Sequence, residues 1–278
     1  MKKINRRSFL AAAGLTAAAL ALTACGGSAS STASSTASSA ASSEAASTSA
    51  AAELTTVEAG KLTMATNAAF PPYEMTTDAG EFEGIDIDTA KAIAEKLGLE
   101  LQIDDMDFDA ALLSVQQGKA DIVMAGVTVT DERKAVMDFS DSYATGIQSI
   151  IVPEGSDITS PDDLAGKKIG TQRGTTGYIY CSDDFGDDAV VAYDDGLTAV
   201  QALNNGQVDA VVIDNAPAKE FVAANPGLVI LDISYAEEDY AIGLAKGSAL
   251  EDAVNATLEE LKADGTLQSI VDKYITAE

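Results

Sequence analysis

Two segments of the chain share one pattern, and this repeat limits the possible folds more than any other feature. They read LLSVQQGKADIVMAG at residues 112–126 and ALNNGQVDAVVIDN at residues 202–215. The turn residues correspond in pairs: Gly118 with Gly206, and Asp121 with Asp209. A helix end, a tight turn and a short apolar strand are typical of an open α/β sheet, in which ligands lie beyond the carboxyl ends of the strands. The repeat therefore predicts two similar α/β lobes with a ligand cleft between them, although such patterns also recur by chance.

The first 24 residues are typical of a signal peptide. A cationic MKKINRR segment precedes an uncharged run from Ser8 to Ala24, which is at the short limit for crossing a bilayer. The run closes with LTAC, which resembles the bacterial lipobox and implies cleavage before Cys25 and lipid attachment to it. The alternative is that the leader stays in place as an uncleaved anchor and that Cys25 is an ordinary surface cysteine. NRRSFL at residues 5–10 also resembles a twin-arginine motif, so export by the Sec or the twin-arginine route is expected.

Residues 25–55 read as a lipidated cysteine followed by a disordered tether. Every residue from Gly26 to Ala52 except Glu44 is Gly, Ser, Ala or Thr. Such a composition buries too little apolar surface to offset its conformational entropy. A flexible chain of this length spans roughly 30 Å, which suits a tether between a membrane surface and a folded region.

Composition excludes several classes of function. Removing residues 1–24 takes away four cations and no acids, so the net charge moves from −27 to −31, which argues against binding nucleic acid or an anionic membrane. The chain has no histidine, which excludes histidine general bases, Ser-His-Asp and Cys-His triads and histidine metal sites. Besides Cys25 only Cys181 is present, and it reads as a small buried hydrophobe. We expect no enzymatic activity, no metal and no cofactor.

The alternation of predicted helices and strands divides the remaining chain into two lobes. Lobe 1 is expected to comprise residues 56–144 and 240–278, and lobe 2 residues 145–239. The closing helices, near 248–263 and 266–275, are expected to return to lobe 1, so that two crossings form a hinge. Further expectations are a helix at 88–97 ending at Gly98, a loop through AAFPPYEM, a strand DIVMA, and a capped helix in SPDDLAG.

Five motifs in order resemble the polar amino-acid-binding proteins of ABC importers, which are two-lobed solute receptors of the class II periplasmic type. The motifs are TNAAFPPYEM, EGIDIDTAKAIAEKLG, AGVTVTDERKAVMDFSDSY, LAGKKIGTQRGTTG and VDAVVIDNAPAKEFVAANPG. The resemblance extends from Lys61 to the C-terminus. It implies two α/β lobes joined by two hinge strands, closing over one free amino acid that is passed to an ABC permease. A monomer that meets the membrane only through its lipid is expected.

A free amino acid presents a carboxylate and an ammonium group that must both be paired when they leave water. Arg133 is the natural carboxylate partner, because a guanidinium binds it bidentately and stays charged. The resemblance assigns this role to Arg133 with Gly126 and Thr128, whose backbone and hydroxyl groups can add hydrogen bonds. The alternative is that Arg133 pairs with Asp131 or Asp138 on a solvated helix.

The ammonium partner is expected in lobe 2. The resemblance assigns it to Asp214, which ends the strand of the second repeat and alternatively caps the following helix. Thr175 and Thr176 resemble the second-lobe donors to the carboxylate, at a helix N-terminus that suits an anion.

The ligand side chain is expected to lie between Phe70 and Phe108, which match two aromatic walls of the family but can also be ordinary core. Asn67 stands where several relatives carry an acid, which favours a neutral, glutamine-like ligand. Gln172 departs from the glutamine pattern, and Asp86 also occurs in arginine-type binders. A binder of basic amino acids is therefore the alternative, ahead of a dehydratase or a sensory module on the same fold.

Overall fold

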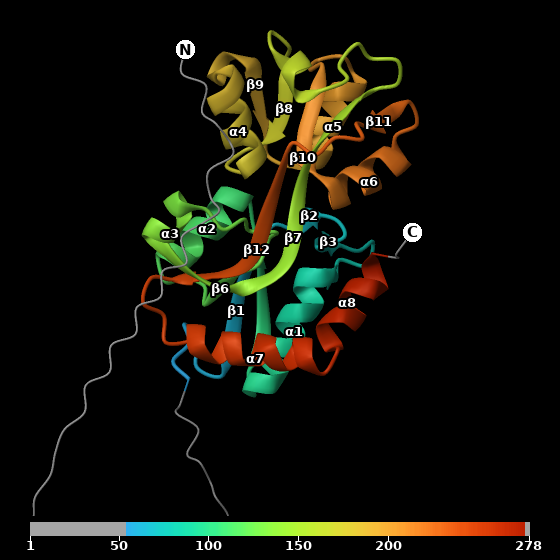
Figure 1. Ribbon diagram of the computed structural model, residues 1–278. Coiled ribbons are helices and arrows are strands. Elements are labelled where there is room, and N and C mark those ends of the chain that lie inside the picture. Colours follow the sequence, from blue (N-terminus) through green and yellow to red (C-terminus); the bar gives the residue numbers. More distant parts are fainter. Residues whose placement is uncertain (1–53, 276–278) are drawn as a thin grey trace, which may run out of the picture. The chain divides into compact units, whose positions relative to one another are not determined.

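The computed structural model describes residues 54–275, so the predicted signal peptide, Cys25 and tether lie outside the described residues. One mixed sheet runs through the described part in the order β5-β1-β6-β12-β7-β10-β8-β9, with β11 paired to β7 (Figure 1). The strands of this sheet are β1 Lys61–Thr66, β5 Glu100–Asp105, β6 Ile122–Val123, β7 Met137–Pro153, β8 Ile169–Gln172, β9 Val190–Tyr193, β10 Ala210–Asp214, β11 Leu228–Ile230 and β12 Ala236–Ala245. The α-helices are α1 Ile85–Leu97, α2 Phe108–Gln116, α3 Asp131–Val136, α4 Thr176–Phe185, α5 Gly196–Asn204, α6 Asn215–Ala224, α7 Glu251–Ala263 and α8 Thr266–Tyr274.

The strand order is mirrored about the pair β12–β7. On one side the order outward is β6, β1, β5, and on the other it is β10, β8, β9. Each set is parallel and is connected in the same sequence, strand–helix–strand–helix–strand, through α1 and α2 or through α4 and α5. We refer to the β5-β1-β6 set as lobe 1 and the β10-β8-β9 set as lobe 2. The two α/β lobes predicted from the repeat are confirmed.

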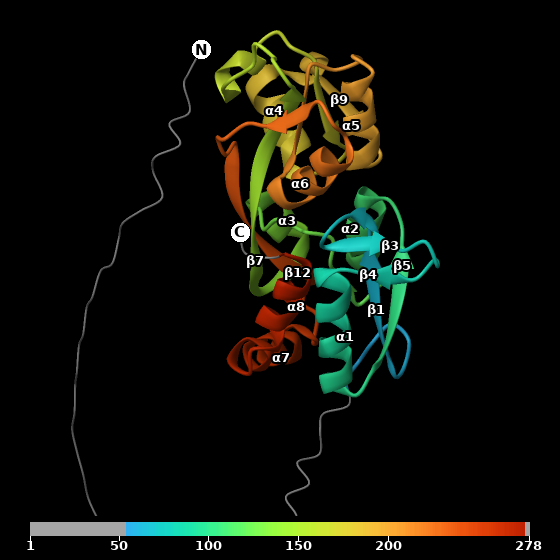
Figure 2. The ribbon, with the colours of Figure 1, turned by 90° about the vertical axis from the view of Figure 1, so that its right-hand side faces the viewer.

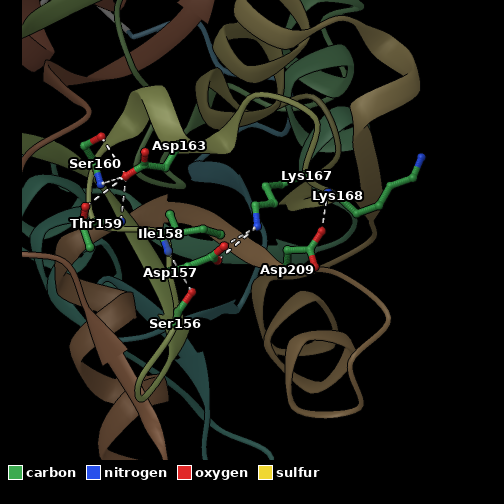
Figure 3. A network of polar contacts seen from close by, with 9 residues as sticks. All are labelled: Ser156, Asp157, Ile158, Thr159, Ser160, Asp163, Lys167, Lys168 and Asp209. Carbon is green, nitrogen blue, oxygen red and sulfur yellow. Dashed lines mark hydrogen bonds and ion pairs between the residues drawn. The ribbon is translucent and has the colours of Figure 1, made fainter.

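The repeated Gly-x-x-Asp turn has the same structure in both lobes. Gly118 and Gly206 each come directly after the end of a helix. Both have a φ of +66°, a conformation that glycine adopts without a side-chain clash. The Asp121 carboxylate accepts the backbone N–H of Thr63 at the start of lobe 1 at 2.8 Å. Asp209 accepts the N–H of Lys168 at 2.7 Å in the same way (Figure 3). Each aspartate thus joins the start of its lobe's central strand to the turn before its third strand.

Two long strands connect the lobes. β7 and β12 are antiparallel, with Ala236 opposite Gln148 at one end and Ala245 opposite Met137 at the other. Figures 1 and 2 show both strands passing from lobe 1 into lobe 2. Helices α7 and α8 pack on α1 of lobe 1. The boundaries at 144/145 and 239/240 fall within β7 and β12 and stay a prediction.

Several elements differ from the expectation. The AAFPPYEM loop contains β2 Ala69–Phe70 and β3 Glu74–Thr76, which pair with each other and with β4 Phe82–Glu83 in a separate sheet. The SPDDLAG segment has the expected cap, with Ser160 and Asp163 forming a capping box, but the helix that it begins is a short 3-10 helix, Pro161–Leu164 (Figure 3). Strand β6 is shorter than DIVMA, and α1 begins three residues before Asp88. The predicted helix end at Gly98 is confirmed, with φ of +69°.

Candidate functional site

A cavity lies where the strands of both lobes end. Its lining contains every ligand-binding residue predicted from the sequence: Asn67, Phe70, Phe108, Gly126, Thr128, Arg133, Gln172, Thr175, Thr176 and Asp214. It also contains Glu74, Ala125, Gln148, Ile213 and Tyr240. Asn67 follows β1, while Gln172 and Asp214 end β8 and β10, so the cavity lies at the carboxyl edge of the sheet.

Arg133 supplies the positive charge of the cavity. It lies on α3, which begins after Thr130, and the Thr130 hydroxyl caps the helix by accepting the Arg133 N–H at 3.2 Å. The guanidinium donates from Nη1 to the Thr128 carbonyl at 2.8 Å and from Nη2 to the Gly174 carbonyl at 3.2 Å. It also lies over the Phe108 ring, 5.3 Å from the centroid. These contacts orient a cation that is 8% exposed.

Arg133 has no ion-pair partner within the part of the chain that the structure describes. The alternative pairing with Asp138 is not formed, because Asp138 binds Lys246 with a nitrogen–oxygen distance of 2.6 Å. Burial lowers the pKa of Arg133, and the negative charge of Glu238 opposes this shift. A buried guanidinium without an ion-pair partner is suited to accept an anionic group from a ligand.

The N-terminus of α4 adds hydrogen-bond donors on the lobe 2 side. The Thr175 hydroxyl donates to the Gln172 carbonyl at 2.8 Å and accepts the Tyr178 N–H at 3.4 Å, so it is used within the helix cap. The Thr176 hydroxyl donates to Glu238 at 3.0 Å. The predicted turn lines the cavity, but both hydroxyls have protein partners. The backbone N–H groups of the first helical turn, which have no acceptor within a helix, are better suited to an anion.

Asp214 supplies a buried negative charge from lobe 2. Its Oδ2 accepts the Ile147 N–H at 2.7 Å and the Tyr240 hydroxyl at 2.8 Å, while its Oδ1 accepts the Ala216 N–H at 3.1 Å and caps α6. The side chain thus caps a helix and lines the cavity at once. Burial raises the pKa of Asp214 to about 6. A cationic group beside it would favour the ionised form and offset this cost.

Gly126 lies at the turn after β6, where its φ of +55° and its close neighbours favour glycine. An added Cβ would lie 3.0 Å from the Phe70 ring and 3.1 Å from the Tyr240 ring. Its N–H donates to Asp86 Oδ2 at 3.0 Å, so this N–H is not free for a ligand, and only the carbonyl is left.

A pair of buried carboxyl groups stands behind Gly126. Asp86 Oδ2 also accepts the Tyr143 hydroxyl at 2.8 Å. Both Glu74 oxygens and Asp86 Oδ1 have no other hydrogen-bond partner among the described residues. Burial and the neighbouring Asp86 charge raise the pKa of Glu74 well above its ordinary value, and burial raises the pKa of Asp86 to about 6. Two carboxyl groups in this setting favour sharing one proton.

Aromatic rings form the apolar walls. Phe70 is 9% exposed and Phe108 is 5% exposed, and both line the cavity as the sequence predicted. Phe70 stacks on Tyr73 with centroids 5.9 Å apart, and Tyr73 meets Tyr240 edge-on at 5.4 Å. Because these rings support one another, the Phe70 wall is held in place without a ligand.

Two amides meet across the cleft. Gln172 Nε2 donates to Asn67 Oδ1 at 2.8 Å, which joins lobe 2 directly to lobe 1. Asn67 Nδ2 donates to the Met106 carbonyl at 2.9 Å, and Gln172 Nε2 also donates to the Asp194 carbonyl at 3.3 Å. The pair lines the cavity with neutral groups that can both donate and accept.

The described residues contain no group of histidine, cysteine or acidic side chains arranged to hold a metal ion. Among them there is also no helix long and apolar enough to span a membrane.

Comparison with known proteins identifies the family. Residues 62–277 match the family described as bacterial extracellular solute-binding proteins, family 3. The chain belongs to this family. The homologues that the comparison finds are amino-acid-binding transport proteins and not enzymes.

Relatives and solved structures of the family extend over most of the chain. A probable histidine-binding protein of Neisseria gonorrhoeae is 32% identical and covers 99% of this chain, which in turn covers 98% of the relative. An ancestral arginine-binding protein bound to glutamine is 42% identical, with a TM-score of 0.75 and coverage of 78% of this chain and 99% of that one. The same description bound to arginine gives 43% identity, a TM-score of 0.74 and coverage of 78% and 98%. The type II fold of this family of solute-binding proteins is thus confirmed.

Two buried residues at the cavity were missed from the sequence: Tyr240 lines it, and Glu238 binds the hydroxyl groups of two residues that line it. Glu238 and Tyr240 lie on β12 and are 6% and 1% exposed. They stand two positions apart on one face of the strand, and the exposed residues Glu237 and Asp239 alternate with them on the other face. Their alternation with exposed acids is a signal that sequence reasoning can use, since a buried carboxylate in a strand needs partners.

Proposed function

We propose that this protein captures a free amino acid outside the cytoplasm and delivers it to an ABC importer. The observation that carries the proposal is the pair of opposite buried charges on one cavity, with Arg133 from lobe 1 and Asp214 from lobe 2. A carboxylate beside Arg133 and an ammonium group beside Asp214 satisfy both. A ligand that contacts both lobes stabilises the closed arrangement in preference to an open one.

The names of several relatives support this proposal. An arginine-binding extracellular protein of Bacillus subtilis and an ABC transporter glutamine-binding protein of the same organism are 32% and 35% identical to this chain. An L-cystine-binding protein of Escherichia coli is 32% identical. These ligands differ in their side chains and share the α-carboxylate and α-ammonium groups, which are the groups that the Arg133 and Asp214 charges suit.

For the ligand side chain, the neutral amide pair favours a polar, glutamine-like group. Asn67 and Gln172 line the cavity and offer donors and acceptors without charge. A basic amino acid is the second candidate, because Glu74 also lines the cavity and a cationic side chain beside it would favour its ionised form. The two candidates differ in whether a cationic side chain finds a carboxylate.

A thermal-shift screen of the twenty amino acids tests the proposal. A ligand present at 100 times its Kd stabilises the protein by about 2.7 kcal/mol, and the largest shift is expected with glutamine. The variant Asn67→Asp should move the preference toward lysine or arginine, since it adds a carboxylate at the amide pair. If the unaltered protein prefers arginine and Asn67→Asp leaves this unchanged, side-chain selectivity does not depend on Asn67. If no amino acid stabilises the protein, the proposed function is wrong.

We further propose that the mature protein is held at the outer face of the cell membrane by a lipid on Cys25, after export by the Sec or the twin-arginine route. The LTAC motif supports this, as does the extracellular description of the family. Cys25 lies outside the described residues. The receptor is proposed to act as a monomer whose two lobes, 56–144 with 240–278 and 145–239, move about the β7–β12 pair.

A further inference from the structure

One carboxylate oxygen on the connecting strand β12 accepts hydrogen bonds from three directions. Glu238 Oε2 accepts the Thr128 hydroxyl at 3.0 Å, the Thr176 hydroxyl at 3.0 Å and the Gln148 amide at 3.1 Å. Glu238 Oε1 has no hydrogen-bond partner within residues 54–275. All three hydrogen bonds therefore end on a single oxygen of Glu238, a residue that is 6% exposed.

The three donors belong to different parts of the fold. Thr128 lies beyond β6 in lobe 1, Thr176 begins α4 in lobe 2, and Gln148 lies on the other connecting strand, β7. The Thr128 and Thr176 hydroxyl oxygens are 3.3 Å from each other. Their separation is short only while the two lobes face each other closely, so an opening of the cleft breaks at least one of the bonds to Glu238.

We propose that Glu238 is a positioning residue that holds the two lobes together over the ligand. This inference rests on the proposed function, since it concerns the closed state of the same cleft. Hydrogen bonds to a charged acceptor are about twice as strong as neutral ones. Because they exist only in the closed arrangement, they raise its population and with it the apparent affinity for the ligand.

Glu238 acts on the ligand through Thr128 and Thr176, and it does not itself line the cavity. Replacing Glu238 should therefore lower the affinity for every ligand by about the same factor. Replacing a residue that contacts the ligand side chain should instead change the selectivity between ligands. Because the bonds break when the cleft opens, their loss should increase the rate of ligand release and leave the association rate almost unchanged.

Calorimetry and stopped-flow release on the full chain test the proposal with the variants Glu238→Gln and Glu238→Ala. Gln keeps an accepting oxygen without the charge, so affinity should fall roughly 3- to 10-fold, and with Ala roughly 10- to 100-fold, through faster release. The matched control is Glu237→Gln, which removes the same charge from the exposed face of β12 and should change affinity less than twofold.

Three outcomes would overturn the proposal. Tighter binding by Glu238→Gln would show that the carboxylate repels the ligand. A lowered melting temperature with unchanged affinity would show a purely structural role. A factor that differs strongly between ligands would place Glu238 in direct contact with the ligand side chain. If the unaltered protein binds no amino acid, the proposed function fails before these variants are compared.

Variants of Thr176 provide an independent check if Glu238 variants fold poorly. Thr176→Val removes the hydroxyl at similar volume, and Thr176→Ser retains it. We expect Thr176→Val, and not Thr176→Ser, to speed ligand release. Combining Thr176→Val with Glu238→Gln should add little to the effect of either change alone, because both remove the same hydrogen bond. Full additivity of the two changes would contradict the proposed contact.

Discussion

At the scale of single residues, the site depends on two buried charges, neither of which forms an ion pair with another of the residues 54–275. Arg133 is 8% exposed and Asp214 is 2% exposed, and each is oriented by neutral hydrogen bonds alone. Such bonds fix a side chain without neutralising it. A zwitterionic ligand brings the missing charges, which explains how the cavity can hold a small molecule through its main-chain groups.

Replacing Arg133 should weaken binding strongly. Removing one partner of a buried charge pair costs about 3–5 kcal/mol, or roughly 200- to 4,000-fold in affinity. Calorimetry of Arg133→Ala should show a loss of that size in a protein that is still folded. The control is Arg173→Ala. Arg173 is exposed, and its nitrogen–oxygen distance to Asp194 is 3.7 Å, so its removal should change ligand affinity little. A loss of less than tenfold for Arg133→Ala would exclude it as the carboxylate partner.

Ligand affinity should fall in mild acid because of Asp214. Burial raises its pKa to about 6, so below this pH the carboxyl group takes up a proton and ceases to pair with an ammonium group. We expect affinity to fall by up to about tenfold per pH unit below pH 6. Titrations between pH 5 and 8 should show this dependence, and Asp214→Asn should bind weakly with a much flatter profile. Equal pH dependence in the two proteins would assign the titration to another group.

The stability of the protein without ligand should change with pH in the opposite sense. The pKa of Asp214 in the folded protein lies above its ordinary value of 3.8. The folded state therefore binds this proton more tightly than the unfolded state, and protonation of Asp214 stabilises the fold. This contribution is fully present below pH 3.8 and is lost as the pH rises through about 6, on the order of 3 kcal/mol. Urea unfolding of the protein and of Asp214→Asn should diverge across this window, and parallel curves would contradict the shift.

The sequence predicted which residues line the cavity and predicted the directions of their hydrogen bonds less well. Arg133 and Asp214 stand at strand ends or in motif turns, and these positions follow from local pattern. The Gly126 N–H instead donates to Asp86, and the Thr176 hydroxyl to Glu238. These partners are distant in sequence, so their proximity results from the packing of strands and the closing of lobes.

At the scale of elements, the turn between β8 and α4 brings lobe 2 into contact with lobe 1. Gly174 has a φ of +74°, and its carbonyl accepts a hydrogen bond from Arg133. A Cβ at this position would overlap the carboxylate of Asp109 on α2. The turn therefore favours glycine for its backbone conformation, and a larger residue would also require the exposed Asp109 side chain to move aside.

Gly174→Ala should impair closure. The overlap is with the end of an exposed side chain that can move aside, so we expect the low end of the cost of overpacking, about 1 kcal/mol or roughly 5-fold in affinity. Gly155→Ala is the matched control, because Gly155 has a φ of +79° with no atom near its Cβ position. Calorimetry should show weaker binding for Gly174→Ala alone, and Asp109→Ala in the same chain should restore much of the loss. Equal affinity in the two glycine variants, or no rescue, would contradict the proposed overlap.

Element types were predicted best where a local signal is strong. Gly98 ends α1 and the Gly-x-x-Asp turns recur in both lobes, because these conformations depend on the residues themselves. The AAFPPYEM segment was expected to be a loop and forms β2 and β3, whose pairing depends on β4 further along the chain. Short antiparallel pairing of this kind leaves little periodicity in the sequence.

At the scale of the whole molecule, the described residues form two mirrored α/β lobes joined by β7 and β12, and the predicted leader and tether precede them. The leader predicts that the receptor is retained by a lipid. Cys25→Ser should abolish fatty-acid labelling and release the protein from the membrane or leave it uncleaved. Metabolic labelling with a fatty acid and fractionation check this. Normal labelling of the variant would rule out Cys25 as the lipid attachment site.

The central claim, that the cavity binds an amino acid by its two main-chain charges, is tested most directly by calorimetry with blocked ligands. The amino acid that gives the largest thermal shift is compared with its N-acetyl derivative, which has no ammonium group, and with its C-terminal amide, which has no carboxylate. Binding of the free amino acid at one site per chain is predicted, with a loss of roughly 200-fold or more for either derivative. A derivative that binds as tightly as the free amino acid would contradict the claim.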